Sequence, residues 1–198
     1  MKIYLVRHGQ TDWNAEVRMQ GQTDIPLNQV GLAQAQQVAQ TIAGRVLDGL
    51  KIDAIYSSDL SRAHDTAKAI AERLNMSVVL DERLREQGKG DLEGVEISTL
   101  GRVGEFGDKI LIEKWWSDFK RSPEKFNAES GQSLFIRSKS FLDGVKKSGI
   151  QGVVVVSHGG TMAMLQYAVL NDVFEIENFL TVDIARFIKN CDIVELDY

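Results

Sequence analysis

Apolar residues recur along the chain with two spacings, which together predict strands that alternate with helices. Short apolar runs have the length of strands, and longer segments with apolar residues on one face have the spacing of helices. The predicted strands are Lys2–Val6, Asp53–Ser57, Met76–Leu80, Gly152–Val156, Val182–Lys189 and Asp192–Asp197, with a turn at Asn190–Cys191 between the last two. The predicted helices are residues 29–47, which Asn28 can cap, Ser58–Leu74, 132–148 and 161–170.

The valine run Val153–Val156 gives the strongest strand signal in the chain. Four consecutive valines predict a strand buried on both faces, as in a parallel sheet covered by helices. We therefore expect an α/β fold, a doubly wound and mostly parallel sheet with helices on both faces, whose last strands can be antiparallel. We expect one domain over residues 1–198. Residues 95–131 mix glycine, charge and the Trp115–Trp116 pair, and we expect them to form a small cap insertion over a site, helical near 110–121.

Composition limits the partners and the compartment. A formal charge of -5 and a pI near 5.3 leave no broad basic surface for nucleic acid or an anionic membrane. The apolar runs are much shorter than the roughly 20 residues of a membrane span, and no signal-peptide core precedes the first strand. The single cysteine, Cys191, cannot form an intramolecular disulfide. We expect a soluble cytoplasmic protein, and the sequence leaves a homodimer open.

Ionisable side chains follow the ends of four predicted strands. Arg7 and His8 follow the first strand, Arg62 the second, Glu86 the third and His158 the valine strand. In doubly wound sheets, ligands bind outside the carboxyl ends of the strands, so these side chains are expected to share one crevice. Two of the three histidines stand in the same context, an apolar strand followed by His-Gly, where glycine lets a ligand approach the backbone.

Two arginines and two histidines in one crevice suit a phosphoryl group, because guanidinium groups donate forked hydrogen bonds to its oxygens. The helix that starts after Gly159–Gly160 adds backbone N–H donors. A neutral His8 can attack phosphorus in line and form a phosphohistidine, which water later hydrolyses. Glu86 is the candidate acid for the leaving oxygen, which requires it to be protonated when the ester binds, and it can later act as base for water.

Several motifs, in order along the chain, resemble a known family. Leu5–Thr11, followed by Asn14, resembles the signature of the histidine phosphatases, also called the phosphoglycerate-mutase-like superfamily. The other similar segments are Gln20–Leu27, Tyr56–Ala63, Leu84–Glu86 with Leu92–Gly94, and Val156–Gly160. Together they cover most of residues 3–94 and 150–170.

The resemblance implies a role for each candidate residue. It implies that His8 is the phosphoryl acceptor, that Glu86 is the proton donor, and that Arg7, Arg62 and His158 form the phosphate pocket. It also implies that no metal or other cofactor takes part. The residues that we expect to contact the substrate are Gln10, Asn14, Gln20, Gly21, Lys89 and Gly159.

Some positions depart from the family pattern. Lys89 and Leu92 stand where many relatives carry aromatic residues, and Glu129–Ser133 replaces the usual Gly-Gly-Glu-Ser helix start. The middle segment also lacks the adjacent arginine pair with which established mutases hold a second phosphate. We therefore expect a phosphatase that hydrolyses small phosphorylated metabolites. The alternative is a phosphoglycerate mutase that depends on 2,3-bisphosphoglycerate.

Two other classes of protein are disfavoured. A metal hydrolase would use the two histidines and Glu86 as ligands, but the flanking arginines would repel a dication. A phospho-ligand binding module without turnover would not need both an acceptor histidine and an acid. We interpret His64, two residues after Arg62, as structural, and the Trp115–Trp116 pair as core or cap packing.

Overall fold

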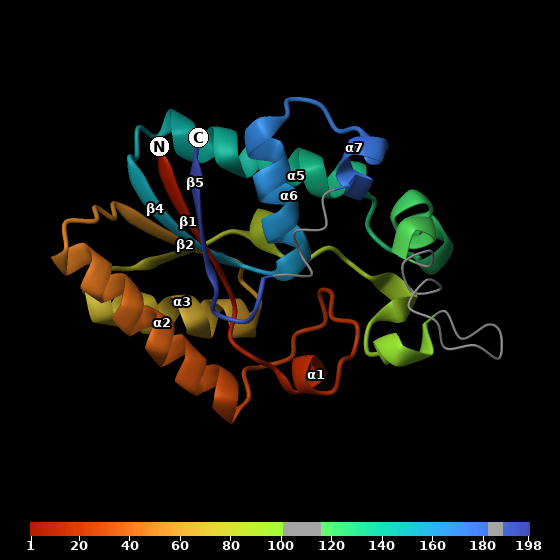
Figure 1. Ribbon diagram of the computed structural model, residues 1–198, viewed down its shortest axis with the longest axis horizontal. Helices are drawn as coiled ribbons and strands as arrows, with labels where there is room; N and C mark the ends of the chain where they lie inside the picture. The colour runs from red at the N-terminus through yellow and green to blue at the C-terminus, as the bar shows by residue number, and fades with distance from the viewer. Residues whose placement is uncertain (101–115, 182–187) are drawn as a thin grey trace.

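The computed structural model describes residues 1–100, 116–181 and 188–198. These residues form a five-stranded sheet in the order β3-β2-β4-β1-β5 (Figure 1). The strands are β1 (Lys2–Arg7), β2 (Ala54–Ser57), β3 (Val78–Leu80), β4 (Gly152–Ser157) and β5 (Ile193–Asp197). The first four are parallel to one another, and β5 pairs with β1 in the antiparallel direction at the edge. The predicted fold class is therefore confirmed.

Helices cover both faces of the sheet because side chains alternate along each strand. The described helices are α1 (Asp12–Ala15), α2 (Gln29–Leu47), α3 (Ser61–Leu74), α5 (Gly131–Lys147), α6 (Gly159–Leu170) and α7 (Ile176–Thr181). In β1, Ile3 and Leu5 lie in one core with α5 and α6, whereas Tyr4 and Val6 lie in another with α2 and α3 (Figure 1). All four valines of β4 are fully buried, as the valine run predicts.

Most predicted boundaries shift by one to three residues, while the bounds of α2 are those predicted. The helix predicted from Ser58 begins at Ser61, because Leu60 is extended and serves as the N-cap. The strand predicted from Met76 begins at Val78, because the backbone N–H of Met76 donates to Ala71 and ends α3. Such backbone contacts are not encoded in the apolar pattern.

The predicted tail strands have different outcomes. The second is confirmed as β5, and the turn before it contains Cys191 in a left-handed conformation. The first, Val182–Lys189, lies largely outside the described residues. The predicted helix near 110–121 is described only from residue 116, and residues 116–121 are helical. None of the described helices is long and apolar enough to cross a membrane.

The pairing of β1 with β4 brings the two His-Gly motifs to one edge of the sheet. Arg7 lies opposite Ser157 in the parallel register, so His8 and His158 leave neighbouring strands at the same level. β2 lies on the other side of β4 and ends at Ser57, shortly before α3 begins. The carboxyl ends of three neighbouring strands therefore deliver the candidate residues to one place.

The packing of the core next to this edge predicts how a substitution there changes the free energy of unfolding. Leu142 of α5 is fully buried in the cluster that covers one face of the sheet. Leu142→Ala should lower the free energy of unfolding by about 2–5 kcal/mol, measured by urea denaturation, because it leaves a cavity. Leu47→Ala, at a site 89% exposed, is the matched control and should change it by less than about 0.5 kcal/mol. Equal effects of the two substitutions would contradict this packing.

Candidate active site

A cavity of about 580 Å³ lies at the carboxyl ends of the parallel strands. It collects most of the predicted site residues, namely Arg7, His8, Asn14, Gln20, Arg62, Glu86, Lys89, His158 and Gly159. Gln10 and Gly21 do not line it. The Gln10 side chain accepts a hydrogen bond from Asn28, and the Gly21 carbonyl accepts one from Arg62. Their predicted contacts with a substrate stay predictions.

The His8 ring is oriented by a single backbone contact. Its Nδ1 lies 2.7 Å from the carbonyl oxygen of Gly9, and a carbonyl can only accept, so Nδ1 carries the proton. In the neutral ring, Nε2 then holds the lone pair, and it has no hydrogen-bond partner among the described residues. Burial and the charges of Arg62 and Arg7 hold the pKa of His8 well below its usual value. The imidazole is therefore neutral, as a nucleophile requires.

His158 faces His8, with the ring centroids 5.0 Å apart, but both of its nitrogens are engaged. Nδ1 accepts from Nε of Arg62 at 3.2 Å, so Nε2 carries the proton and donates to Ser58 Oγ at 2.9 Å. Burial and the Arg62 charge hold the pKa of His158 well below its usual value. A direct contact between His158 and a phosphoryl group requires one of these hydrogen bonds to be exchanged.

Arg7 presents unpaired donors in a buried position. Its Nη1 donates to the carbonyl of Ile188 at 2.6 Å. Its Nε is buried and has no partner among the described residues. Burial lowers the pKa of Arg7 in spite of the opposing charge of Glu86. A buried N–H without a partner is costly, and an anion in the cavity would satisfy it.

Arg62 is fully buried and is held by backbone carbonyls. Nη1 donates to Thr23 at 3.0 Å and Nη2 to Gly21 at 2.6 Å, which leaves one further N–H on each of these nitrogens. Burial lowers the pKa of Arg62 to about 10, so the group stays charged at neutral pH. The loop that supplies both carbonyls is itself fixed, because the Glu93 carboxylate accepts the backbone N–H groups of Gln22 and Thr23.

Glu86 lies against the first turn of α6. Its Oε2 accepts from the backbone N–H of Gly160 at 2.9 Å, and its Oε1 accepts from Thr161 at 3.1 Å and Gln87 at 2.8 Å. A Cβ at Gly160 would lie 2.6 Å from Oε1, so a side chain there would displace the Glu86 carboxylate from this position. The amides of Gly160 and Thr161, which the sequence offers as phosphate donors, are thus used by Glu86.

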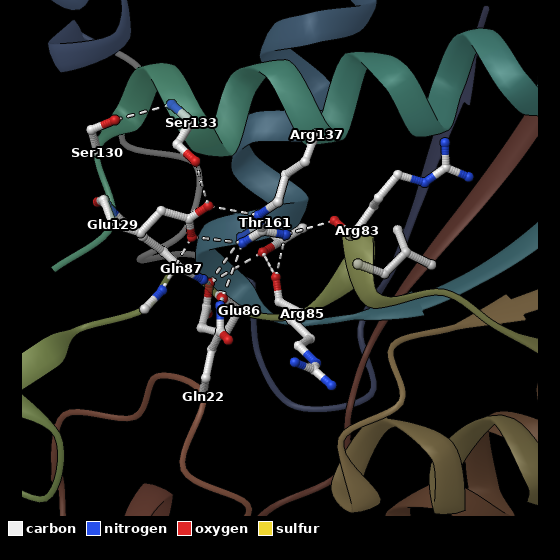
Figure 2. A network of polar contacts seen from close by, with 12 residues as sticks. Gln22, Arg83, Arg85, Glu86, Gln87, Glu129, Ser130, Ser133, Arg137 and Thr161 are labelled. Carbon is white, nitrogen blue, oxygen red and sulfur yellow. Dashed lines mark hydrogen bonds and ion pairs between the residues drawn. The ribbon is translucent and has the colours of Figure 1, made fainter.

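A partly buried arginine of α5, Arg137, holds the segment that carries Glu86 (Figure 2). Arg137 donates through Nη1 to the carbonyls of Arg83 and Arg85, both at 2.6 Å, and through Nη2 to that of Glu86 at 3.0 Å. Glu129 forms a forked pair with the same guanidinium at 2.8 and 2.9 Å. The carbonyl of Glu86 also accepts from the Gln22 side chain, which joins this segment to the Arg62 loop.

Several residues that build the site were not found from the sequence. Asn190, in the turn before β5, donates to the carbonyl of His8 at 2.9 Å and to the Asn14 side chain at 3.2 Å. Ser58, Glu93, Glu129 and Arg137 likewise act on site residues through hydrogen bonds. Ser58 and Glu93 lie in the segments Tyr56–Ala63 and Leu92–Gly94 that resemble the family, and Glu129 was noted as a departure from its pattern, but no role was assigned to them. Asn190 was expected only as part of a turn, and for Arg137 the sequence gives no local signal.

Within the described ranges, no group of three or more histidine, cysteine, aspartate and glutamate side chains is arranged to hold a metal ion.

The fold and the cluster of arginines and histidines at its strand ends are typical of proteins that handle phosphoryl groups. The chain belongs to the histidine phosphatase superfamily (branch 1), whose family model matches residues 3–198. The resemblance stated from the motifs is therefore confirmed, and it extends over nearly the whole chain.

Named relatives include a mutase and two phosphatases. The chain is 35% identical over 199 residues to the "Probable phosphoglycerate mutase GpmB" of Enterobacter sp. (strain 638), covering 100% of this chain and 85% of that protein. It superimposes on a mycobacterial glucosyl-3-phosphoglycerate phosphatase in complex with VO3 with a TM-score of 0.81 and 30% identity, covering 99% and 92% of the two chains. The chain also superimposes on a phosphoserine phosphatase from Entamoeba histolytica in complex with 3-phosphoglyceric acid. The TM-score is 0.73 and the sequence identity 28%, over 98% of this chain and 89% of that one.

The contacts of Arg137 in Figure 2 predict a loss of stability when this arginine is replaced, and the chain offers a matched control. Arg137→Met removes the cationic partner of the largely buried Glu129 and the donor to the Arg83 carbonyl, although the Arg85 and Glu86 carbonyls keep Thr161 and Gln22. The free energy of unfolding should therefore fall by about 3 kcal/mol. Arg45→Met removes an exposed pair with Glu195 and should cost less than about 1 kcal/mol. Urea denaturation of both variants measures the difference, and equal losses would contradict a structural role for the Arg137 network.

Proposed function

We propose that the protein is a phosphatase that hydrolyses small phosphate monoesters through a phosphohistidine at Nε2 of His8. One observation carries the proposal. The lone pair of a neutral, buried imidazole opens on the same cavity as two guanidinium groups, that of Arg62 fully buried and that of Arg7 partly buried, each with N–H donors left over. An attacking nitrogen beside a cationic cradle is the arrangement that in-line phosphoryl transfer requires.

In the first half-reaction, Nε2 of His8 attacks phosphorus, and the bond from phosphorus to the ester oxygen breaks. Arg7 and Arg62 donate to the phosphoryl oxygens, whose negative charge they offset. Glu86, in its protonated form, gives its proton to the departing oxygen so that an alcohol leaves instead of an alkoxide. The product is a phosphohistidine and a Glu86 carboxylate.

In the second half-reaction, a water molecule attacks the phosphohistidine. The Glu86 carboxylate takes a proton from this water, a new phosphorus–oxygen bond forms, and the nitrogen–phosphorus electron pair returns to Nε2. Inorganic phosphate leaves, and Glu86 is protonated again. His158 acts in both steps by holding Arg62 through its Nδ1 and by packing against the His8 ring.

The mutase alternative forms the same phosphohistidine and differs in the molecule that accepts the phosphoryl group from it. It is favoured by the name of the Enterobacter relative, whereas two solved structures similar to this chain are named as phosphatases. Incubation with 3-phosphoglycerate and a trace of 2,3-bisphosphoglycerate separates the two. A phosphatase releases phosphate, and a mutase forms 2-phosphoglycerate instead.

The nucleophile makes the first functional prediction. His8→Ala should lower the turnover of p-nitrophenyl phosphate by roughly a thousandfold or more, because the covalent route is lost. The wild-type protein, quenched during turnover, should carry an acid-labile phosphoryl group on His8, detectable by mass spectrometry. His64→Ala is the matched control, since His64 does not line the cavity. Near-normal turnover by His8→Ala would refute the proposal.

The acid makes the second functional prediction, in which the leaving group is varied. Glu86→Gln should lower kcat for an alkyl phosphate by about 10²- to 10⁴-fold, because an alkoxide needs the proton. It should lower kcat for p-nitrophenyl phosphate by less than roughly tenfold, because nitrophenolate leaves without one. Glu82→Gln, at an exposed carboxylate, is the control. Equal losses on the two substrates would exclude Glu86 as the acid.

A further inference from the structure

The Lys89 side chain is buried and lies in the wall of the cavity. It is 7% exposed, lines the cavity and follows Glu86 by three residues. Its backbone N–H donates to Glu93 at 3.0 Å. The next residue, Gly90, has a φ of 54°, and a Cβ there would lie 2.1 Å from the carbonyl oxygen of Phe126. The backbone around Lys89 is therefore held in place, which limits where its ammonium group can go.

The ammonium group has no anionic partner in the part of the chain that the structure describes. Its Nζ donates to the neutral side chain of Gln87 at 2.7 Å and lies over the rings of Phe119, at 5.1 Å, and Trp116, at 5.8 Å. Among the described residues, none of the carboxylates is within ion-pair distance of it. Burial lowers the pKa of Lys89, although the charges of Glu86 and Glu129 act in the opposite direction.

A buried ammonium in this position is unusual. Lysine is rarely buried unless it is paired, and aromatic faces compensate only part of the lost hydration. An ammonium group has three donors, and one of them is used here. Within residues 1–100, 116–181 and 188–198 the other two have no acceptor, so they can serve a group inside the cavity. The rings of Trp116 and Phe119 limit water at this position, so a charge-assisted hydrogen bond formed there is strong.

We propose that Lys89 binds a carboxylate on the organic part of the phosphate monoester, at a subsite distinct from the phosphoryl pocket of Arg7 and Arg62. This inference rests on the proposed phosphatase function. A carboxylate carries one negative charge and matches one buried ammonium beside a neutral amide. Lys120 and Lys189 also line the cavity, but neither is as buried as Lys89. Lys89 is thus a residue that selects the substrate.

A purely structural reading of Lys89 is that its contacts with Trp116 and Phe119 attach the helix at residues 116–121 to the loop. That role would affect all substrates alike. Substrate pairs that differ only in the carboxylate therefore separate the two readings. O-phosphoserine is matched by O-phosphoethanolamine, and 3-phosphoglycerate is matched by glycerol 3-phosphate, because each second member replaces the carboxylate with hydrogen or a hydroxymethyl group.

The experiment measures kcat/KM for both members of each pair in the wild-type protein, in Lys89→Met and in Lys125→Met. Lys125→Met removes an exposed lysine outside the cavity and is the matched control. The wild type should prefer the carboxylate member of at least one pair by roughly tenfold to a hundredfold, as one charge-assisted hydrogen bond allows. Lys89→Met should remove that preference by a loss confined mainly to the carboxylate member.

Two results would overturn the inference: an equal rate for both members of each pair in the wild type, or an equal loss on both members in Lys89→Met. Turnover of p-nitrophenyl phosphate and labelling of His8 separate this failure from failure of the phosphatase proposal. If both are present without a carboxylate preference, only the Lys89 subsite is wrong. If neither is present, the phosphatase function itself is refuted.

Discussion

The site depends on burying two guanidinium groups without neutralising them. Neither Arg7 nor Arg62 forms an ion pair within the described residues, and the carbonyls of Ile188, Thr23 and Gly21 hold them instead. A carbonyl satisfies an N–H and leaves the positive charge intact, whereas a carboxylate would cancel it. Burial, together with this retained charge, holds the pKa of both neighbouring imidazoles well below its usual value and keeps them neutral. One constraint therefore accounts both for the capacity to hold an anion and for the free lone pair beside it.

Because backbone carbonyls hold the two arginines, the backbone of the loops is part of the site. The carbonyls can point inward only if the loops are fixed from behind, and two partly buried carboxylates do this. Glu93 fixes the loop under Arg62, and Glu129, through Arg137, fixes the segment of Glu86. Neither of these two carboxylates lines the cavity, so they anchor the loops without pairing with Arg7 or Arg62.

The sequence predicts which residues meet at the site better than it predicts the groups that hold them in place. The residues His8, Arg62 and His158 follow strand ends, and parallel strands end at one edge, so their convergence follows from strand order. The bounds of α2 were predicted because its cap and apolar stripe are local signals. The carbonyls that hold Arg7 and Arg62, and the carboxylate at Glu93, act through distant backbone groups. Backbone groups are the same in every residue, so the sequence carries no sign of these contacts.

The contacts of Ile188 and Asn190 with Arg7 and His8, at the end of β1, also constrain the order in which parts of the protein can fold. Their partners, Arg7 and the carbonyl of His8, lie 181 and 182 residues away along the chain. β1 must likewise wait for β4 before it lies inside a sheet. Contacts of this range form late in folding and close long loops. A chain emerging from the ribosome would therefore hold every motif of the site before the contacts that complete the site could form.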